Sequence, residues 1–245
     1  MKTMVFASRN AKEILRDFLN LAFGIGFPLI VLLLLSAIQA NVPVELFTIG
    51  RLAPGIAVFG LSFVSLFSGM LIAKDRTSSF MLRLFTSPMQ PRDFIFGYVL
   101  PLLPMAVAQT AVCFAAAIAL GLPVDVHILY SIAAIFPAAV LFIAIGLLCG
   151  SLFNDKQVGG VCGALLTNVS AWLSGTWFDL NLVGGGFKKV ADALPFVHAV
   201  DAGRAALAGD WSSLWPNLWW VMGYAAVILA IAVAVFRRKM NGDVK

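Results

Sequence analysis

The sequence predicts an all-α, polytopic membrane protein with six transmembrane helices. Six segments contain no Lys, Arg, Asp or Glu, and each exceeds the roughly 20 residues that a helix needs to cross a hydrocarbon core. Hydrophobic residues make up 61% of the chain and charged residues only 12%, and the mean hydropathy is +0.95. A soluble domain carries about 25% charged residues. The six segments are residues 18–44, 52–73, 94–124, 126–154, 157–178 and 211–236.

The regions outside these segments are short. The longest runs from Asp179 to Asp210 and is itself rich in Gly, Leu, Ala and Phe. This leaves no sizeable stretch for an aqueous domain. We therefore expect residues 1–245 to form a single transmembrane domain.

Basic residues divide unevenly between the two sides of such a bundle. With six crossings, 13 of the 17 Lys and Arg residues fall on the side of the termini, whereas the acidic residues divide evenly. Basic residues accumulate on the cytoplasmic side of membrane proteins. We therefore expect both termini in the cytoplasm and the protein in the cell (plasma) membrane. The outward side receives only Arg51, Lys188, Lys189 and Arg204.

The composition indicates no metal, no cofactor and no nucleic-acid partner. Cys113, Cys149 and Cys162 lie inside predicted spans, where free cysteines commonly serve as small packing residues, and their spacing matches no metal site or disulfide framework. The net charge of +5 comes from basic residues at the span ends. We expect these residues to contact membrane lipids.

Residues 5–20 predict an amphipathic elbow helix ahead of the first span. Apolar side chains recur at helical spacing on one side, and polar side chains fill the other. Such a helix lies along the membrane surface and turns into the first span near Leu21. It is either a simple anchor or an elbow that also touches a cytoplasmic partner. The apolar side comprises Ala7, Ala11, Ile14, Leu15, Phe18 and Leu19, and the polar side comprises Arg9, Asn10, Lys12, Glu13, Arg16 and Asp17.

The loop between the second and third spans carries a second short predicted helix. Ser78 or Ser79 can cap its start, and Pro88 disfavours its continuation. Its apolar side chains share one face, which either lies on the bilayer or inserts into a soluble subunit as a cytoplasmic coupling helix. The apolar residues are Phe80, Met81, Leu84 and Phe85, and the flanking basic residues are Arg76 and Arg83.

This loop resembles permeases of the ABC type-2 (ABC-2) exporter class. Their pattern is acidic-Arg-acidic, then Gly-Thr-Leu-Glu-Arg-Leu, then Thr-x-Pro. Here Asp75-Arg76, Arg83-Leu84 and Thr86-Ser87-Pro88 match it. The departures are Thr77 for the second acid, Ser79-Phe80 for Gly-Thr, and Leu82 for Glu.

A second resemblance to the same class follows the fifth span, so that the likeness covers essentially the whole chain. It implies short outward re-entrant helices between the fifth and sixth spans, with Pro195, Asp201 and Arg204 in structural roles. A helix is expected over residues 197–207, in which Asp201 and Arg204 are i, i+3 partners. The matching residues are Ser174-Gly175, Leu194-Pro195, Asp201-Ala202, Arg204 and Gly209.

The energy for transport is expected to come from another protein. The sequence contains no Gly-x-x-x-x-Gly-Lys-[Ser/Thr] phosphate loop, and the predicted spans lack the charged residues of an ion relay. We therefore expect a permease that is not itself an enzyme and that couples to a cytoplasmic ABC ATPase. The alternative is a six-span channel or carrier that is not linked to an ATPase.

An intramembrane hydrolase is a weaker reading of the same sequence. Ser174 and His198 could be imagined as a catalytic pair, but Ser174 lacks a Gly-x-Ser-Gly turn and His198 falls in the outward loop. His127 lies beside Asp125 at a span edge, which is typical of a hydrogen-bonded interfacial histidine.

The resemblance also implies two permease copies with two ATPase copies. A homodimer is expected, and a closely related second permease would be equally compatible. The first, second and fifth spans would line the pathway, and their mostly apolar character favours an amphipathic or lipid-like cargo. Their polar side chains either line this pathway or form hydrogen bonds between helices. They are Ser62, Ser65, Ser68, Thr167, Asn168 and Ser170.

Overall fold

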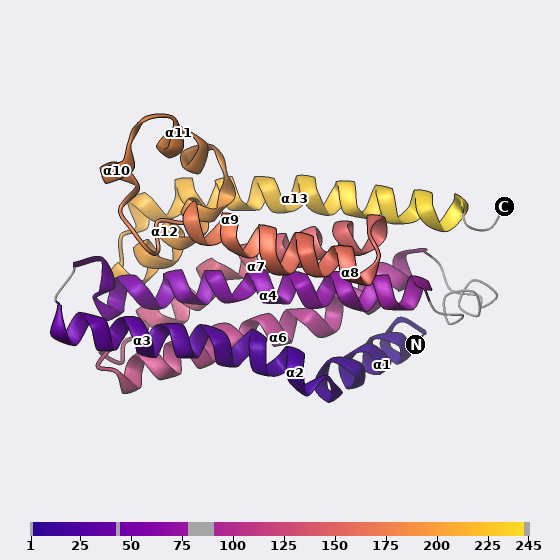
Figure 1. The fold of residues 1–245 in the computed structure, drawn as a ribbon, viewed down its shortest axis with the longest axis horizontal. Coiled ribbons are helices and arrows are strands. Elements are labelled where there is room, and N and C mark those ends of the chain that lie inside the picture. Colours follow the sequence, from indigo (N-terminus) through magenta and orange to yellow (C-terminus); the bar gives the residue numbers. More distant parts are fainter. Residues whose placement is uncertain (1, 43–44, 78–90, 243–245) are drawn as a thin grey trace.

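The computed structural model describes residues 2–42, 45–77 and 91–242, and these ranges contain helices and connecting turns but no strand. Figure 1 shows an elongated bundle in which the long helices run roughly along the longest axis. The all-α fold class predicted from the sequence is confirmed.

Within these ranges, five helical segments are long and apolar enough to cross a membrane. They correspond to the first, second, third, fourth and sixth predicted spans. The first joins the π-helix η1 (Ala22–Gly26) to α3 (Phe27–Asn41), and the others belong to α4 (Ile49–Thr77), α6 (Pro91–Ala119), α7 (His127–Leu152) and α13 (Trp211–Gly242).

The fifth predicted span is a helix of mixed geometry. It runs through α8 (Asp155–Val158), the π-helix η3 (Gly159–Leu166) and α9 (Thr167–Trp172). It ends at Trp172 rather than at residue 178, because Gly175 adopts a left-handed φ of +65° and turns the chain. The helix therefore ends close to the Ser174-Gly175 pair that the resemblance assigns to the end of this span, before the charge-free segment itself ends at residue 178. The count of six spans stays a prediction.

Helix α4 occupies the centre of the bundle. In an apolar 18-residue stretch of α4, 89% of the residues are buried inside the molecule, against 28% in the corresponding stretch of Ala22–Asn41 and 17% in that of α13. Helices α6, α7 and α12 (Pro195–Ala208) pack around it, and one large cluster of buried apolar side chains joins them. The outer helices α3 and α13 consequently leave most of their surface for lipid or a partner.

Helices α4 and α7 approach so closely that only glycine fits at two positions of α7. A Cβ on Gly146 would lie 2.2 Å from the carbonyl oxygen of Ser65, and a Cβ on Gly150 would lie 2.5 Å from that of Gly69. Small residues four apart permit such an approach in membrane helices. Gly159 and Gly163 repeat this spacing on η3, but nothing lies within 4 Å of a Cβ on Gly159.

The N-terminal segment forms α1 (Lys2–Arg16), followed by the single turn α2 (Phe18–Leu21). The side of α1 that faces the bundle differs from the predicted apolar side. Asn10 is fully buried, because its amide nitrogen donates to the carbonyl oxygen of Gly97 at 2.9 Å, whereas Leu15 is 71% exposed. Phe6 and Ala7 complete the buried side.

Three helices connect α9 to α13: α10 (Leu180–Val183), α11 (Gly185–Ala193) and α12. Pro195 lies in the first turn of α12, where its missing N–H needs no partner. Gly209 ends the helix with a left-handed φ of +72°. The helix expected over residues 197–207 is therefore present, and it packs against α4, α7 and α13.

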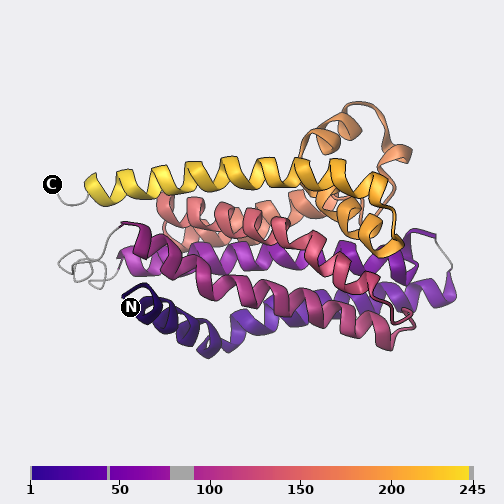
Figure 2. The ribbon, with the colours of Figure 1, turned by 180° about the vertical axis from the view of Figure 1, so that it is seen from behind.

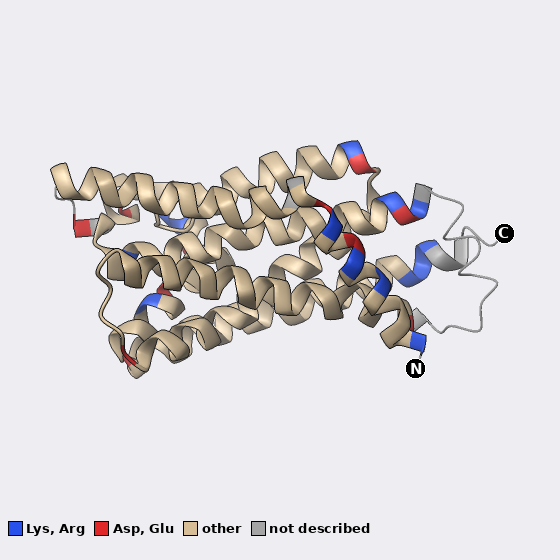
Figure 3. Ribbon diagram, turned by 90° about the horizontal axis from the view of Figure 1, so that it is seen from below, with Lys and Arg blue, Asp and Glu red and all other residues tan. Residues whose placement is uncertain are grey.

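The start of α1 and the end of α13 lie at the same end of the bundle, which we call the terminal end (Figures 1 and 2). Figure 3 shows that most of the Lys and Arg residues gather there. The opposite, far end carries α10 to α12 and the start of α13 (Figure 1). The six tryptophans all belong to segments at or near the far end: Trp172, Trp177, Trp211, Trp215, Trp219 and Trp220.

Candidate coupling and translocation sites

A buried ion pair at the terminal end joins α1 to α4. Asp75, in the last turns of α4, is 3% exposed. Arg9 of α1 donates to its two carboxylate oxygens at 2.7 and 2.9 Å, and the Tyr98 hydroxyl of α6 donates to it at 3.0 Å. Burial opposes the charge of Arg9, but the hydrogen bond to Asp75 and the negative charges of Asp75 and Glu13 together outweigh it, so that the pKa of Arg9 lies above its ordinary value. The cluster fastens three helices to one another.

Apolar and polar contacts surround this ion pair. The ring of Phe6 meets those of Phe94 and Tyr98 edge-on, with centroids 5.9 and 5.0 Å apart. A Cβ on Gly97 would lie 2.2 Å from the Phe6 ring, so α1 and α6 touch closely. The hydroxyl of Thr3 donates to Asp93 at 2.6 Å. The N-terminal helix is therefore packed onto the bundle.

Arg76 is the one predicted coupling residue that the structure describes. Its guanidinium donates to the carbonyl oxygen of Gly150, near the end of α7, at 2.9 Å. Asp75 and Arg76 together tie the end of α4 to α1, α6 and α7. The other predicted coupling residues, Phe80, Met81, Arg83, Leu84 and Phe85, lie outside the described residues.

An apolar groove of about 530 Å³ lies between the first, second and fifth predicted spans. These are the spans that the resemblance assigned to the pathway. Thr167 and Asn168 are the predicted pathway residues that line it. The remaining lining is almost entirely aromatic and aliphatic: Phe23, Phe27, Val31, Phe59, Phe63, Ala171, Trp172, Trp177 and Phe178.

The other predicted pathway residues do not line the groove. Ser62 donates to the carbonyl oxygen of Phe59 at 2.7 Å, and Ser170 donates to that of Thr167 at 3.1 Å. Ser68 donates across to Ile143 of α7 at 3.1 Å, whereas the buried hydroxyl of Ser65 has no hydrogen-bond partner among the described residues. Three of these four serines thus satisfy backbone carbonyls.

The aromatic lining was missed by sequence reasoning, which looked for polar side chains. The signal was present as Phe59 and Phe63, four residues apart on α4. The centroids of their rings are 5.7 Å apart. The ring of Phe27 lies 5.6 Å from that of Phe63, and the ring of Trp177 lies 5.4 Å from that of Phe59, again between centroids. Edge-on contacts of this kind fix the rings in place.

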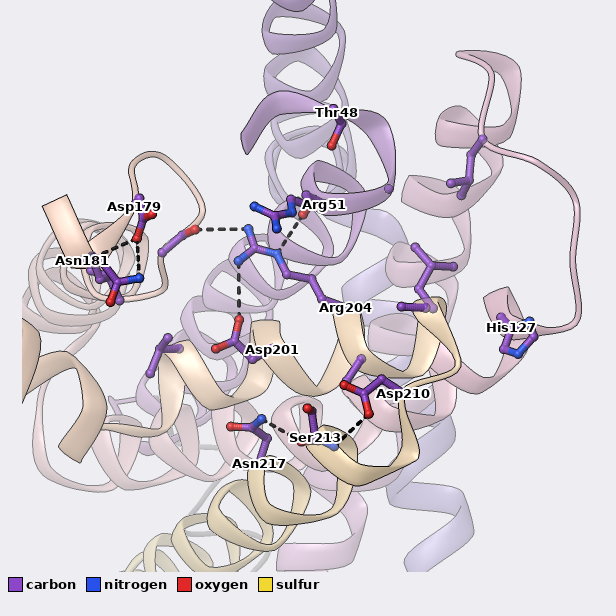
Figure 4. A pocket seen from close by; sticks show the side chains of 18 of the residues that line it. Thr48, Arg51, His127, Asp179, Asn181, Asp201, Arg204, Asp210, Ser213 and Asn217 are labelled. Carbon is purple, nitrogen blue, oxygen red and sulfur yellow. Dashed lines mark hydrogen bonds and ion pairs between the residues drawn. The ribbon is translucent and has the colours of Figure 1, made fainter. Parts of the chain in front are cut away.

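The far end contains a polar cavity of about 980 Å³ (Figure 4). Arg204 projects from α12 into its wall and donates to the carbonyl oxygens of Arg51 and Gly175, both at 3.1 Å. Its third contact is the carboxylate of Asp201 at 3.5 Å. Arg204 thus joins α12 to the start of α4 and to the turn after α9.

Burial shifts the pKa values of two charged residues in this wall, Asp201 and Arg204. Burial raises the pKa of Asp201 above its ordinary value of 3.8, and the attraction of Arg204 offsets this only in part. Burial likewise lowers the pKa of Arg204. The arrangement suits a structural clasp better than acid–base chemistry.

The two residues weighed as a hydrolase pair point to other partners. The Ser174 hydroxyl forms hydrogen bonds with the carbonyl oxygen of Ala171 at 3.0 Å and with the hydroxyl of Thr176 at 2.8 Å. The ring nitrogens of His198 face the side-chain oxygen of Asn217 at 2.6 Å and the carbonyl oxygen of Asp192 at 2.8 Å. Both side chains therefore make structural hydrogen bonds.

Residues 35–234 match the family described as ABC-2 family transporter protein. The chain is also similar to the capsule polysaccharide export inner-membrane protein CtrC of Neisseria meningitidis serogroup A, with 26% identity over 152 residues. That match covers 61% of this chain and 57% of the relative, so the chain spans little more than half the length of that protein. Because the family match extends from α3 to α13, the chain belongs to the ABC-2 family of transporter membrane proteins.

Proposed function

We propose that this chain is the membrane-spanning permease subunit of an ATP-driven exporter. It forms the translocation pathway as a dimer and couples to two copies of a separate cytoplasmic ATPase. The observation that carries this proposal is the family match over residues 35–234. The relative's name, an export inner-membrane protein, supports the outward direction.

The distribution of charge supports an external source of energy. The sequence contains no phosphate-binding loop, and the six predicted spans carry no charged residue that could relay ions. An ATPase that docks at the terminal end would supply the work. The proposal therefore assigns no enzymatic activity to this chain.

The proposed topology places the terminal end in the cytoplasm of a cell membrane. Basic residues gather at that end, as expected for the inner side. The helix from Asp155 to Trp172 serves as the fifth of six spans in this topology, antiparallel to α7. The polar cavity around Arg204 then faces outward.

The terminal-end contacts supply a route for coupling. Residues 78–90, which contain the predicted coupling helix, directly follow α4 in the sequence. A push on them acts first on Asp75 and Arg76, whose partners belong to α1, α6 and α7. A docked ATPase would therefore act on α1, α6 and α7 through the end of α4.

The groove supports a pathway between two protomers. Trp172 at its edge is 57% exposed, and Ile30 and Leu34 of α3 are 62% and 58% exposed. A second copy would cover these side chains and close the groove. Its apolar lining suits the acyl or other hydrophobic part of an amphipathic cargo, with the outward polar cavity available to the hydrated part.

Affinity purification tests the proposal directly. The full chain is captured from native membranes in mild detergent, and co-purifying proteins are identified by mass spectrometry. We expect an ATPase with a Gly-x-x-x-x-Gly-Lys-[Ser/Thr] motif, lost in Phe85→Asp and in Phe80→Asp because a charge would be desolvated at the contact. Leu182→Asp, at an 85% exposed apolar residue of α10, is the matched control and keeps the ATPase.

Two outcomes would contradict the proposal. Recovery of the chain alone, still able to conduct solute across liposomes without ATP, would favour the channel or carrier. Unchanged ATPase capture in both Phe variants would mean that the residue 78–90 segment lies on lipid rather than on the ATPase.

A further inference from the structure

Helix α1 has three sides, of which only one packs on the bundle. The packed side carries Phe6, Ala7 and Asn10. A second, apolar side carries Met4, Ala11 and Leu15 at i, i+7 and i+11 spacing, and Phe18 of α2 follows in the sequence. A third side carries Lys12 and Arg16, four residues apart.

The apolar side is open. Met4 is 66% exposed, Leu15 71% and Phe18 80%. Exposed large apolar side chains on the same side of a helix mark a surface that meets lipid or another protein. Its occupant can be argued from charge and from the course of the chain.

The charges of the neighbouring basic side have no partner among the residues that the structure describes. Arg9 is bound to Asp75 and Glu13, but neither Lys12 nor Arg16 has a hydrogen bond or ion pair within the described ranges. Both side chains are exposed. An apolar strip flanked by unpaired cations complements an acyl layer beneath anionic headgroups.

The chain also brings this helix to the level of the headgroups. Residue Arg16 ends α1, and the first membrane-crossing segment starts at Ala22, after only α2. The far side of α1 is meanwhile held to α4 and α6 by the Asp75 cluster. The helix therefore cannot move far from the membrane surface while the bundle is inserted.

We propose that α1 is a binding site for acidic phospholipids of the inner leaflet. Met4, Leu15 and Phe18 enter the acyl boundary, and Lys12 and Arg16 contact the phosphate groups. This inference rests on the proposed topology, in which the terminal end faces the cytoplasm, but it needs no ATPase.

Reconstitution of the full chain with defined lipids tests this site. The thermal midpoint is compared in nanodiscs of phosphatidylcholine alone and of phosphatidylcholine with phosphatidylglycerol. We expect phosphatidylglycerol to raise the midpoint of the native protein and to do so less at high salt. In Lys12→Gln with Arg16→Gln this rise is lost.

Arg237→Gln with Arg238→Gln is the matched control, because it removes the same charge from exposed residues at the same end of the bundle. The control keeps most of the rise. An equal loss in both double variants would mean general attraction to a basic surface and would overturn the assignment to α1. A rise retained in the Lys12 and Arg16 variant would overturn it as well.

A nitroxide at Leu15→Cys separates lipid from a protein occupant. The native Cys113, Cys149 and Cys162 are buried and leave the new thiol as the accessible one among them. In liposomes without any partner we expect collisions with oxygen to exceed those with a water-soluble nickel complex. If collisions with the nickel complex exceed those with oxygen, and fall only when the ATPase is added, a protein rather than lipid covers the apolar side. Loss of ATPase capture with the lipid effect intact would instead refute the proposed function alone.

Discussion

Buried polar side chains in this bundle are mostly held by backbone carbonyl groups. Ser68 donates to a carbonyl oxygen of the neighbouring helix and the amide nitrogen of Asn10 donates to that of Gly97, while the amide oxygen of Asn10 accepts from Arg9 at 2.7 Å. Asp75 differs, because a carboxylate buried in an apolar bundle is stable only beside a cation. Its pairing with Arg9 is therefore the contact whose loss should matter most.

Replacing Asp75 with Ala should lower the free energy of unfolding by about 2 kcal/mol, since Arg9 loses its buried partner but keeps Glu13 and is 36% exposed. Tyr98→Phe removes one hydrogen bond to the same carboxylate and should cost about 1 kcal/mol. Denaturant unfolding in detergent measures both. Equal stability of Asp75→Ala and the native protein would show that the pair contributes nothing.

Gly146→Ala should be destabilising by about 1–3 kcal/mol, because its Cβ would collide with a backbone oxygen that cannot rotate away. The distance to that oxygen, on Ser65, would be 2.2 Å. Gly223→Ala is the control, since nothing lies within 4 Å of its Cβ on α13. A thermal shift in Gly223→Ala as large as that in Gly146→Ala would argue against close packing as the cause.

The sequence predicted the role of a single residue where that role depends on the residue's own backbone chemistry, and failed where it depends on a partner elsewhere in the chain. Pro195 and Gly209 punctuate α12 as their backbone chemistry requires. Asn10 was assigned to the wrong side of its helix, because periodicity cannot reveal a carbonyl partner on another helix. The aromatic groove was missed because Phe59 and Phe63 look like ordinary membrane-span residues until α3 and α9 are placed beside them.

Among the elements, long charge-free segments were predicted well. Their helical form follows from the need to satisfy every backbone group within a span. The fifth charge-free segment runs past the end of its helix, because the residues after Trp172 stay apolar while Gly175 turns the backbone. Hydropathy expresses whether a side chain prefers water or an apolar phase, and it carries no information about the backbone angle φ.

The stability of α12 should depend on pH through Asp201. Burial raises its pKa in the folded state above 3.8, so the folded protein binds a proton more readily than the unfolded chain. The resulting stabilisation is complete below the unfolded pKa and is lost as pH rises through the folded pKa. We therefore expect the melting temperature of the native protein to rise relative to that of Asp201→Asn as pH falls from neutral toward 3.8. Parallel melting curves for the two proteins across this range would contradict the assignment.

For the whole molecule, the exposed face of α3 locates the expected contact between protomers. Leu34→Cys should form a covalent dimer on oxidation in membranes, since Leu34 is 58% exposed beside the groove helices. Val227 on α13 is equally exposed, at 57%, but α13 runs along the side of the bundle opposite α3 (Figure 1), so Val227→Cys should remain monomeric. Cross-linking is read by gel migration with and without reductant. A dimer through Val227 alone would place the interface on α13.

The placement of the tryptophans makes the two ends of the molecule spectroscopically unequal. All six belong to α9, the turn after it and the first third of α13, and α1 contains none. Intrinsic fluorescence therefore monitors the far end, where Trp177 contacts Phe59 in the groove and Trp220 contacts His198. Detachment of α1 from the bundle would leave that emission nearly unchanged, so a fluorescence record of changes in the groove would carry no information about the terminal end.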